Sequence, residues 1–88
     1  MSTNLTLNEA FKPEQVSVED CLIELARFGS PSVSRMKKGW YTRIDVFVTG
    51  VGVQFKVESE ISNNTLSSSV IQCYDRLAKA MKQIKETT

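Results

Sequence analysis

The chain has 88 residues, of which 41% are hydrophobic and 24% are charged, and its formal net charge is +1. These totals predict one soluble globular domain, and the charge provides no overall attraction to nucleic acid or to an acidic membrane. Histidine is absent, which excludes Ser–His and Cys–His catalytic couples and imidazole metal ligands. No run approaches the roughly 20 apolar residues of a membrane span, and the first residues lack a signal-peptide pattern, so we expect a cytoplasmic protein.

The chain opens with a polar segment. Residues 1–16 contain only scattered apolar side chains, and Pro13 interrupts any helix there. We expect an N-terminal arm that docks through Leu7 and Phe11 on a single α+β domain formed by residues 17–88.

A first helix is expected after this arm. Ser17 is suited to cap a helix over Val18–Phe28, because acids follow it in the first turn and apolar residues recur with a helical period. Gly29 is in position for a left-handed C-terminal cap. Residues 29–39 are expected to be a linker.

Two strands are expected next, joined by a tight turn. In Val51–Ile61, apolar and polar residues alternate, which is typical of a half-buried strand. Gly50 and Gly52 provide the unusual backbone angles that a tight hairpin or a bulge needs. The first strand is expected to run from Trp40 to Thr49.

This first strand carries apolar or aromatic side chains on both of its faces. We expect Trp40, Ile44 and Val46 to face the core, since they alternate in phase. Tyr41 and Phe47 then lie on the other face, beside polar side chains of the second strand. These two residues need a cover, which the N-terminal arm or a second molecule can provide.

A long last helix is expected over Leu66–Lys85, with Thr65 as its N-cap. The order is α-β-β-α, an antiparallel hairpin covered by helices, which is an α+β fold. Two strands make a narrow sheet. We therefore expect a homodimer, or a higher oligomer, in which strand edges pair across a two-fold axis and extend the sheet.

The outer face of the hairpin is the leading candidate for a binding surface. It joins Tyr41 and Phe47 with Arg43 and Lys56, and an exposed apolar patch on a small protein is typical of an interface. We therefore expect a non-enzymatic protein that binds another macromolecule, in the first place a protein, through these four residues.

Basic residues offer an alternative function, nucleic-acid binding, in which cations contact phosphates and aromatic rings stack on bases. The candidates lie around the first strand and on the last helix: Arg35, Lys37, Lys38, Arg43, Arg76, Lys79 and Lys82. They would form one surface if the last helix packed back over the hairpin. In the opposing interpretation, Trp40 anchors the core and the helix bases are a solvated face. A pocket for a small signalling nucleotide at a subunit interface is a third possibility.

Other chemistry is not expected. Cys21 and Cys73 are 52 residues apart without a CxxC partner, so the sequence predicts buried free thiols and no zinc or redox site. Asp45 and Glu58 lie on wet strand faces opposite bases such as Lys56, which favours ion pairs over an acid–base couple or a metal site. We expect no enzyme, no cofactor and no bound metal.

The α-β-β-α order resembles that of double-stranded-RNA-binding domains. Those domains have three strands and a basic motif at the start of the last helix. This chain shows a pattern for two strands, and it has Ser67, Ser68 and Ser69 where the bases would be needed. Their function is therefore not transferred to it.

A pattern of apolar positions resembles small phage and prophage open reading frames of unassigned role. It covers about residues 18–85 and reads Trp40-x3-Ile44-x-Val46, then Gly52-x2-Phe55-x-Val57-x-Ser59-Glu60, then Thr65 before the last helix. The resemblance implies a small accessory protein that acts in the cytoplasm of a bacterial host. Such proteins commonly act by binding, including as inhibitors of host defence systems in the manner of anti-CRISPR proteins.

Overall fold

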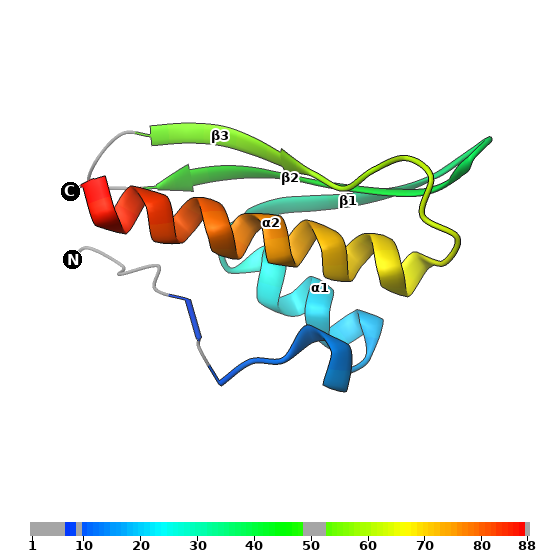
Figure 1. Cartoon of the computed structure of the whole chain (residues 1–88), viewed down its shortest axis with the longest axis horizontal. Helices are drawn as coiled ribbons and strands as arrows, with labels where there is room; N and C mark the ends of the chain where they lie inside the picture. Colours follow the sequence, from blue (N-terminus) through cyan, green and yellow to red (C-terminus); the bar gives the residue numbers. More distant parts are fainter. Residues whose placement is uncertain (1–6, 9, 49–52, 88) are drawn as a thin grey trace.

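The computed structural model describes residues 7–8, 10–48 and 53–87, and it shows two α-helices on one side of a three-stranded antiparallel sheet (Figure 1). The elements follow in the order η1 (a 3-10 helix, Pro13–Gln15), α1 (Val18–Ala26), β1 (Gly29–Met36), β2 (Gly39–Val48), β3 (Val53–Glu58) and α2 (Leu66–Thr87). The α+β class predicted from the sequence is confirmed. The predicted turn around Gly50 and Gly52 lies outside the described residues.

β1 is the main difference from the predicted α-β-β-α order. It takes up the segment predicted as a linker and pairs with β2 along its whole length, from Gly29 opposite Val46 to Met36 opposite Gly39. Pro31 has no backbone N–H, which is tolerated because β1 is an edge strand of the sheet. The observed order is α-β-β-β-α, so the two-stranded sheet that motivated the prediction of an edge-paired dimer is not present.

The third strand also bears on the resemblance to double-stranded-RNA-binding domains, because it removes one of the two differences. The second difference remains, since α2 contains no basic residue before Arg76. Ser69, in the opening turn, is fully buried, and its Oγ lies 2.8 Å from Thr42 Oγ1. This turn packs against the sheet and presents no cationic surface.

α1 begins where the sequence predicts and ends earlier. The Oγ atom of Ser17 accepts a hydrogen bond from the Asp20 N–H at 3.1 Å, as an N-cap side chain does. The last helical residue is Ala26 and not Phe28. Phe28 instead turns its ring into the core, where it is 2% exposed.

Gly29 is not the left-handed cap that the sequence predicts, since its φ angle is not positive. Among the described residues, a positive φ is found at Gly39. Gly29 is the first residue of β1. A Cβ atom at this position would lie 1.8 Å from the carbonyl oxygen of Asp45 on β2. Glycine is needed here for the close approach of two backbones.

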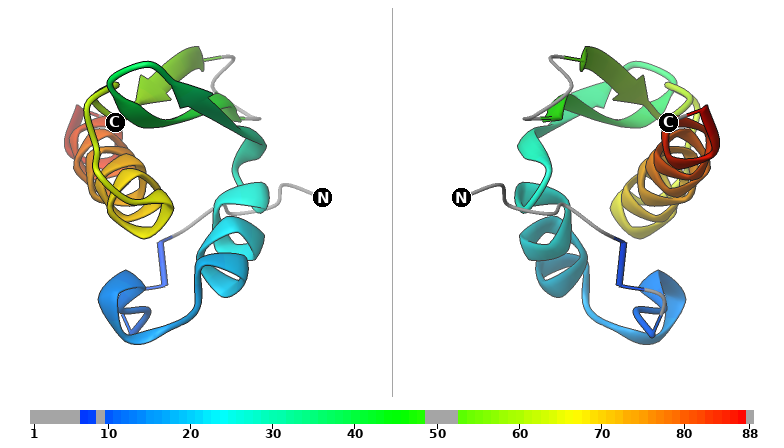
Figure 2. Two further views of the ribbon diagram at one scale, coloured as in Figure 1. Left: turned by 90° about the vertical axis from the view of Figure 1, so that its right-hand side faces the viewer. Right: turned by 90° about the vertical axis from the view of Figure 1, so that its left-hand side faces the viewer.

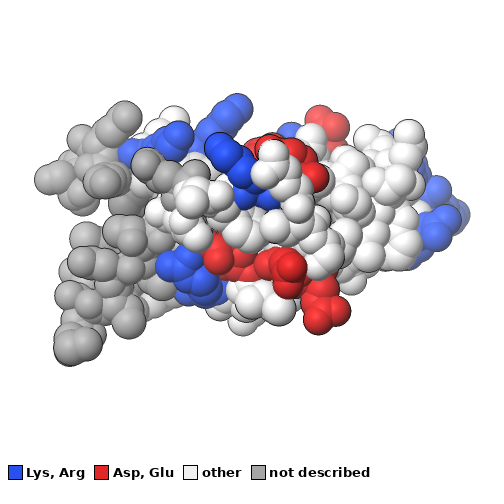
Figure 3. All heavy atoms as spheres, turned by 90° about the horizontal axis from the view of Figure 1, so that it is seen from below, with Lys and Arg blue, Asp and Glu red and all other residues white. Residues whose placement is uncertain are grey.

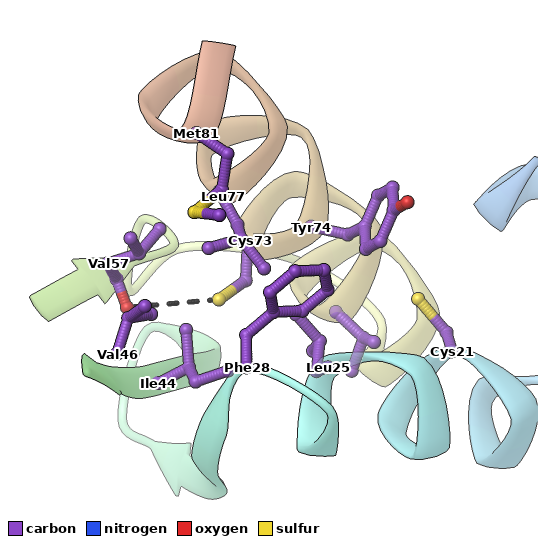
Figure 4. Packing of buried hydrophobic residues seen from close by; sticks show 11 residues of the cluster. Cys21, Leu25, Phe28, Ile44, Val46, Val57, Cys73, Tyr74, Leu77 and Met81 are labelled. Atoms are coloured by element: carbon purple, nitrogen blue, oxygen red, sulfur yellow. Dashed lines mark hydrogen bonds between the residues drawn. The ribbon is translucent and has the colours of Figure 1, made fainter. Parts of the chain in front are cut away.

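Both helices lie on the same face of the sheet, and the apolar core fills the space between them and the strands (Figures 2 and 4). The buried cluster consists of Cys21, Leu25, Phe28, Ile44, Val46, Val57, Val70, Cys73, Tyr74, Leu77 and Met81. Leu7 and Phe11 of the N-terminal arm pack against this cluster, and the rings of Phe11 and Tyr74 are 5.0 Å apart. The described part of the arm therefore docks as predicted, on the helical side.

A buried polar network fastens the start of α2 to the sheet. The Thr42 N–H donates to Ser59 Oγ at 2.9 Å, and the Ser59 N–H donates to the Thr42 carbonyl oxygen at 2.8 Å. The hydroxyl of Thr42 bonds that of Ser69, which in turn donates to the Leu66 carbonyl oxygen. The network joins β2, the residue after β3 and the first turn of α2.

Candidate functional site

The side of the sheet that faces away from the helices carries no other element of the described structure (Figure 2). We call it the outer sheet face. Its members follow from the strand register and alternate with residues on the helical side of the sheet: Ser30, Ser32, Ser34, Met36, Tyr41, Arg43, Asp45, Phe47, Gln54, Lys56 and Glu58. The four residues predicted to bind a partner, Tyr41, Arg43, Phe47 and Lys56, thus lie on one surface.

Four alternately charged side chains at the centre of this face neutralise one another. Nη2 of Arg43 lies 3.4 Å from Oδ2 of Asp45 along β2, and Nζ of Lys56 lies 3.5 Å from Oε1 of Glu58 along β3. Across the strands, Arg43 is opposite Glu58 and Asp45 is opposite Lys56. We call these four residues the charge quartet. Each carboxylate has cationic neighbours, so the quartet is a set of surface ion pairs, which contribute little to stability.

Tyr41 and Phe47 flank the charge quartet on β2. Phe47 is 49% exposed. Tyr41 is partly buried, and burial, followed by its interaction with the Glu58 carboxylate, raises the pKa of its phenol above the ordinary value. The described residues of the N-terminal arm do not provide the predicted cover, because Leu7 and Phe11 pack on the opposite, helical side.

The basic residues of the nucleic-acid alternative lie in three separate places. One is the outer sheet face (Arg43), another is α2 (Arg76, Lys79, Lys82), and the third is the β1–β2 turn (Arg35, Lys37, Lys38). α2 starts near this turn and runs away from it (Figure 1), and Figure 3 shows basic side chains at the right-hand end separated from those at the left by acidic and uncharged atoms. On the face that Figure 3 draws, the basic side chains at the two ends of the molecule therefore do not form one continuous surface.

Arg76 already has partners within the chain. Its Nη1 donates to the carbonyl oxygen of Glu58 at 2.8 Å, and its Nη2 lies 3.7 Å from Oε1 of Glu60. This side chain connects α2 to the end of β3. It is therefore less free to contact phosphate than a solvated base would be.

Trp40 is partly buried and does not belong to the core cluster. The guanidinium of Arg35 lies over its ring, with Cζ 5.3 Å from the ring centroid. The interpretation of Trp40 as a core anchor is therefore wrong, although Ile44 and Val46, in phase with it, are fully buried as predicted.

Cys21 and Cys73 are buried free thiols, as the sequence predicts. Burial raises the pKa of Cys21 to about 11 and that of Cys73 to about 12. The thiol of Cys73 points to the Val57 carbonyl oxygen at 3.8 Å (Figure 4). Because the thiolate is the nucleophilic form, neither cysteine is prepared for catalysis at neutral pH.

We expect the free energy of unfolding to fall as the pH rises above 9, because burial raises the pKa values of these two thiols. The unfolded chain loses its thiol protons near the ordinary pKa of 9.0, whereas the folded chain keeps them until about 11 to 12. In this window the unfolded state binds fewer protons, so the free energy of unfolding decreases with rising pH. Urea denaturation at neutral pH and at steps up to about pH 11 measures the fall, and Cys73→Ala should make it shallower. An equal fall in the variant would contradict the assignment.

No strand is predicted over β1 from the sequence. The row of serines on β1 and the exposed Met36 are therefore not expected on the outer sheet face, although the structure places them there. The available signal was the period of two in Ser30, Ser32 and Ser34. Glu58 is predicted as a wet-face carboxylate, but its electrostatic interaction with Tyr41 depends on the register of β2 and β3.

Within the described ranges, no three His, Cys, Asp or Glu side chains gather to hold a metal ion. None of the helices described there has the length and apolar character to cross a membrane. Comparisons of the chain with protein-family models, with curated proteins and with solved structures return no match. The binding surface is therefore inferred from the geometry of the structure.

Proposed function

We propose that this chain is a non-enzymatic binding protein that contacts another protein through the outer sheet face. The observation that carries the proposal is a whole sheet face left uncovered in the described structure, with Phe47 about half exposed on it. A wet face is ordinary for an antiparallel sheet, but large aromatic side chains on it are not. Aromatic residues and arginine are enriched at protein interfaces.

The charge quartet favours a protein partner over nucleic acid on this face. Its two cations, Arg43 and Lys56, are each beside a carboxylate, so the face has no excess positive charge for a phosphate backbone. Alternating charges instead favour a partner that presents the complementary pattern, and they set the register of the two surfaces.

A second copy of the chain fits this requirement, and we include a homodimer in the proposal. A two-fold axis parallel to the strands and midway between β2 and β3 would place Arg43 against Glu58 of the second copy. The same rotation would place Asp45 against Lys56 of that copy, because these residues are opposite one another in the register. Such an isologous contact brings together unlike charges throughout the quartet.

The origin of a heterologous partner is proposed on the sequence resemblance alone. The resemblance to phage and prophage reading frames supports a macromolecule of a bacterial host as the target. In its narrowest form, the proposal is that the protein inhibits a component of a bacterial defence system in the cytoplasm of that host.

Phe47→Ala and Tyr41→Ala are expected to reduce capture of the partner by about tenfold or more, since interface aromatics are frequent hot spots. Their melting temperatures should stay close to that of the unchanged protein, because neither side chain belongs to the buried cluster. The measurement is a pull-down with tagged protein from a nuclease-treated bacterial lysate, followed by direct binding to the purified partner. Ile23→Ala is the matched control, since Ile23 is an exposed apolar residue on α1.

Light scattering after size-exclusion chromatography distinguishes the two proposed partners of the outer sheet face, a second copy of the chain and a different protein. A dimer that Phe47→Ala and Asp45→Lys convert into monomers identifies the second copy as the occupant. A mass of one chain at all concentrations overturns the homodimer. A large fall in melting temperature for both aromatic variants would mean that these side chains stabilise the fold and would overturn the binding role.

A further inference from the structure

The turn between β1 and β2 is a compact basic feature outside the outer sheet face. We call the segment Arg35–Trp40 the hairpin tip. Met36 pairs with Gly39, so that Lys37 and Lys38 form a two-residue turn. Both lysines are exposed, and the tip lies at one end of the 40 Å long axis (Figure 1).

The backbone of the hairpin tip is held firmly. Gly39 has a φ of 153°, and a Cβ atom there would lie 2.3 Å from the Asn63 carbonyl oxygen. The same oxygen accepts a hydrogen bond from the Trp40 N–H at 2.7 Å. The Asn63 side chain is in turn bonded to Gln72 and Ser68 of α2. The backbone that follows the turn is therefore fixed to the start of α2 through Asn63. This lowers the conformational entropy that the turn loses when a ligand binds.

The charge at the hairpin tip is not neutralised within the described part of the chain. Arg43 and Arg76 have carboxylates within ion-pair distance. No carboxylate of the described ranges forms such a pair with Arg35, Lys37 or Lys38. Figure 3 shows, on the face that it draws, Lys and Arg atoms at the right-hand end set apart from the other basic atoms. A protein whose net charge is only +1 thus has a strongly positive end.

The arrangement of Arg35 and Trp40 favours phosphate contact over base stacking. The guanidinium covers one face of the indole, with Cζ 5.3 Å from the ring centroid, so this face is not open to a base. The contact also restricts the arginine side chain, and a planar guanidinium held in place is well suited to phosphate oxygens.

We propose that the hairpin tip binds the phosphate backbone of nucleic acid through Arg35, Lys37 and Lys38. A two-stranded ribbon fits the major groove of B-form DNA, and the tip is such a ribbon, so duplex DNA is the first probe. Met36 is the one exposed large apolar side chain described at the tip, which is little for insertion into a membrane. Arg35, Lys37 and Lys38 are not members of the outer sheet face, and their proposed role does not depend on the function proposed for that face.

The test is the binding of a fluorescently labelled DNA duplex, measured by anisotropy over a range of salt concentrations. Three phosphate contacts predict a slope of about −2.7 in a plot of log K against log salt concentration. The double variant Lys37→Glu/Lys38→Glu is expected to bind at least about tenfold more weakly at low salt, with a slope near −0.9. Single-stranded DNA of the same length shows which form of the backbone the tip prefers.

The matched control is Lys79→Glu/Lys82→Glu, which changes the net charge equally at exposed positions of α2. It should bind DNA nearly as well as the unchanged protein, and so should Phe47→Ala. Equal losses in the two lysine double variants would show a response to net charge and would overturn the site. Absence of binding to both duplex and single-stranded DNA at low salt would overturn it as well. Binding only to phosphatidylglycerol vesicles would assign the tip to a membrane surface and contradict the proposal.

Discussion

Gly29→Ala is expected to lower the free energy of unfolding by about 3 kcal/mol, at the upper end of what overpacking costs. The added Cβ would lie 1.8 Å from the carbonyl oxygen of Asp45 and 2.8 Å from its carbonyl carbon. Both are backbone atoms of Asp45 on β2, the central strand, where Asp45 is paired with Ser30 of β1 and with Lys56 of β3, so they cannot move without disturbing strand pairing. Because domains of this size are stable by roughly 5 to 10 kcal/mol, the loss is a large fraction of the total.

Urea denaturation followed by the fluorescence of Trp40 measures this change. Ser30→Ala is the control, since Ser30 is the next residue of β1 and is exposed on the outer sheet face. It should change the free energy of unfolding by less than about 0.5 kcal/mol. If Gly29→Ala were as mild as this control, β1 would not approach β2 as closely as described.

Ile44→Ala is expected to cost about 3 kcal/mol, and Phe47→Ala close to nothing, although the second substitution removes more atoms. Ile44 is fully buried, and its removal leaves a cavity among residues of the helices and the sheet. Phe47 lies on the opposite face of the same strand and is 49% exposed. Which of the two variants loses more stability depends only on which face of β2 the helices cover.

The two variants are compared by chemical denaturation in the same buffer. Similar losses would mean that the outer sheet face is packed against something in the purified protein, for example a second copy. Dilution distinguishes this case, because stability that depends on a second copy falls with protein concentration. A loss for Phe47→Ala that is independent of concentration would contradict the described exposure.

The elements that the sequence predicts well are those with signals inside the element itself. α1 and α2 carry apolar residues with a helical period, and their caps, Ser17 and Thr65, bond the backbone N–H groups of Asp20 and Ser68 at 3.1 Å. β3 shows strict alternation. In each case the residues that define the element also define its buried side.

β1 could not be recognised in this way because its stability comes from its neighbour. Its residues, GSPSVSRM, include few that favour strands. They are held extended by pairing with β2, which is a strong strand and is buried on one face. The serines at alternate positions were a correct signal of period two, but without apolar partners they did not distinguish a strand from a linker.

The candidate site was partly predictable for a similar reason. Alternation along β2 assigns Tyr41 and Phe47 to the face opposite Ile44, outside the core, and there Phe47 is exposed and Tyr41 is partly buried. Alternation gives the face of a residue but not its distance from the core, which is why Trp40 was misplaced. The direction of α2 relative to the hairpin depends on the buried bond between Thr42 and Ser69, for which the sequence has no local signal.

The two borders of the sheet have a consequence for behaviour at high concentration. On β1, Pro31 lacks the N–H that an added strand would need. On β3, the carbonyl oxygen of Glu58 is occupied by Arg76. Neither border therefore offers an unbroken row of donors and acceptors on which further molecules could add to form a cross-β fibre. The folded state therefore does not present β1 or β3 as a template for amyloid growth.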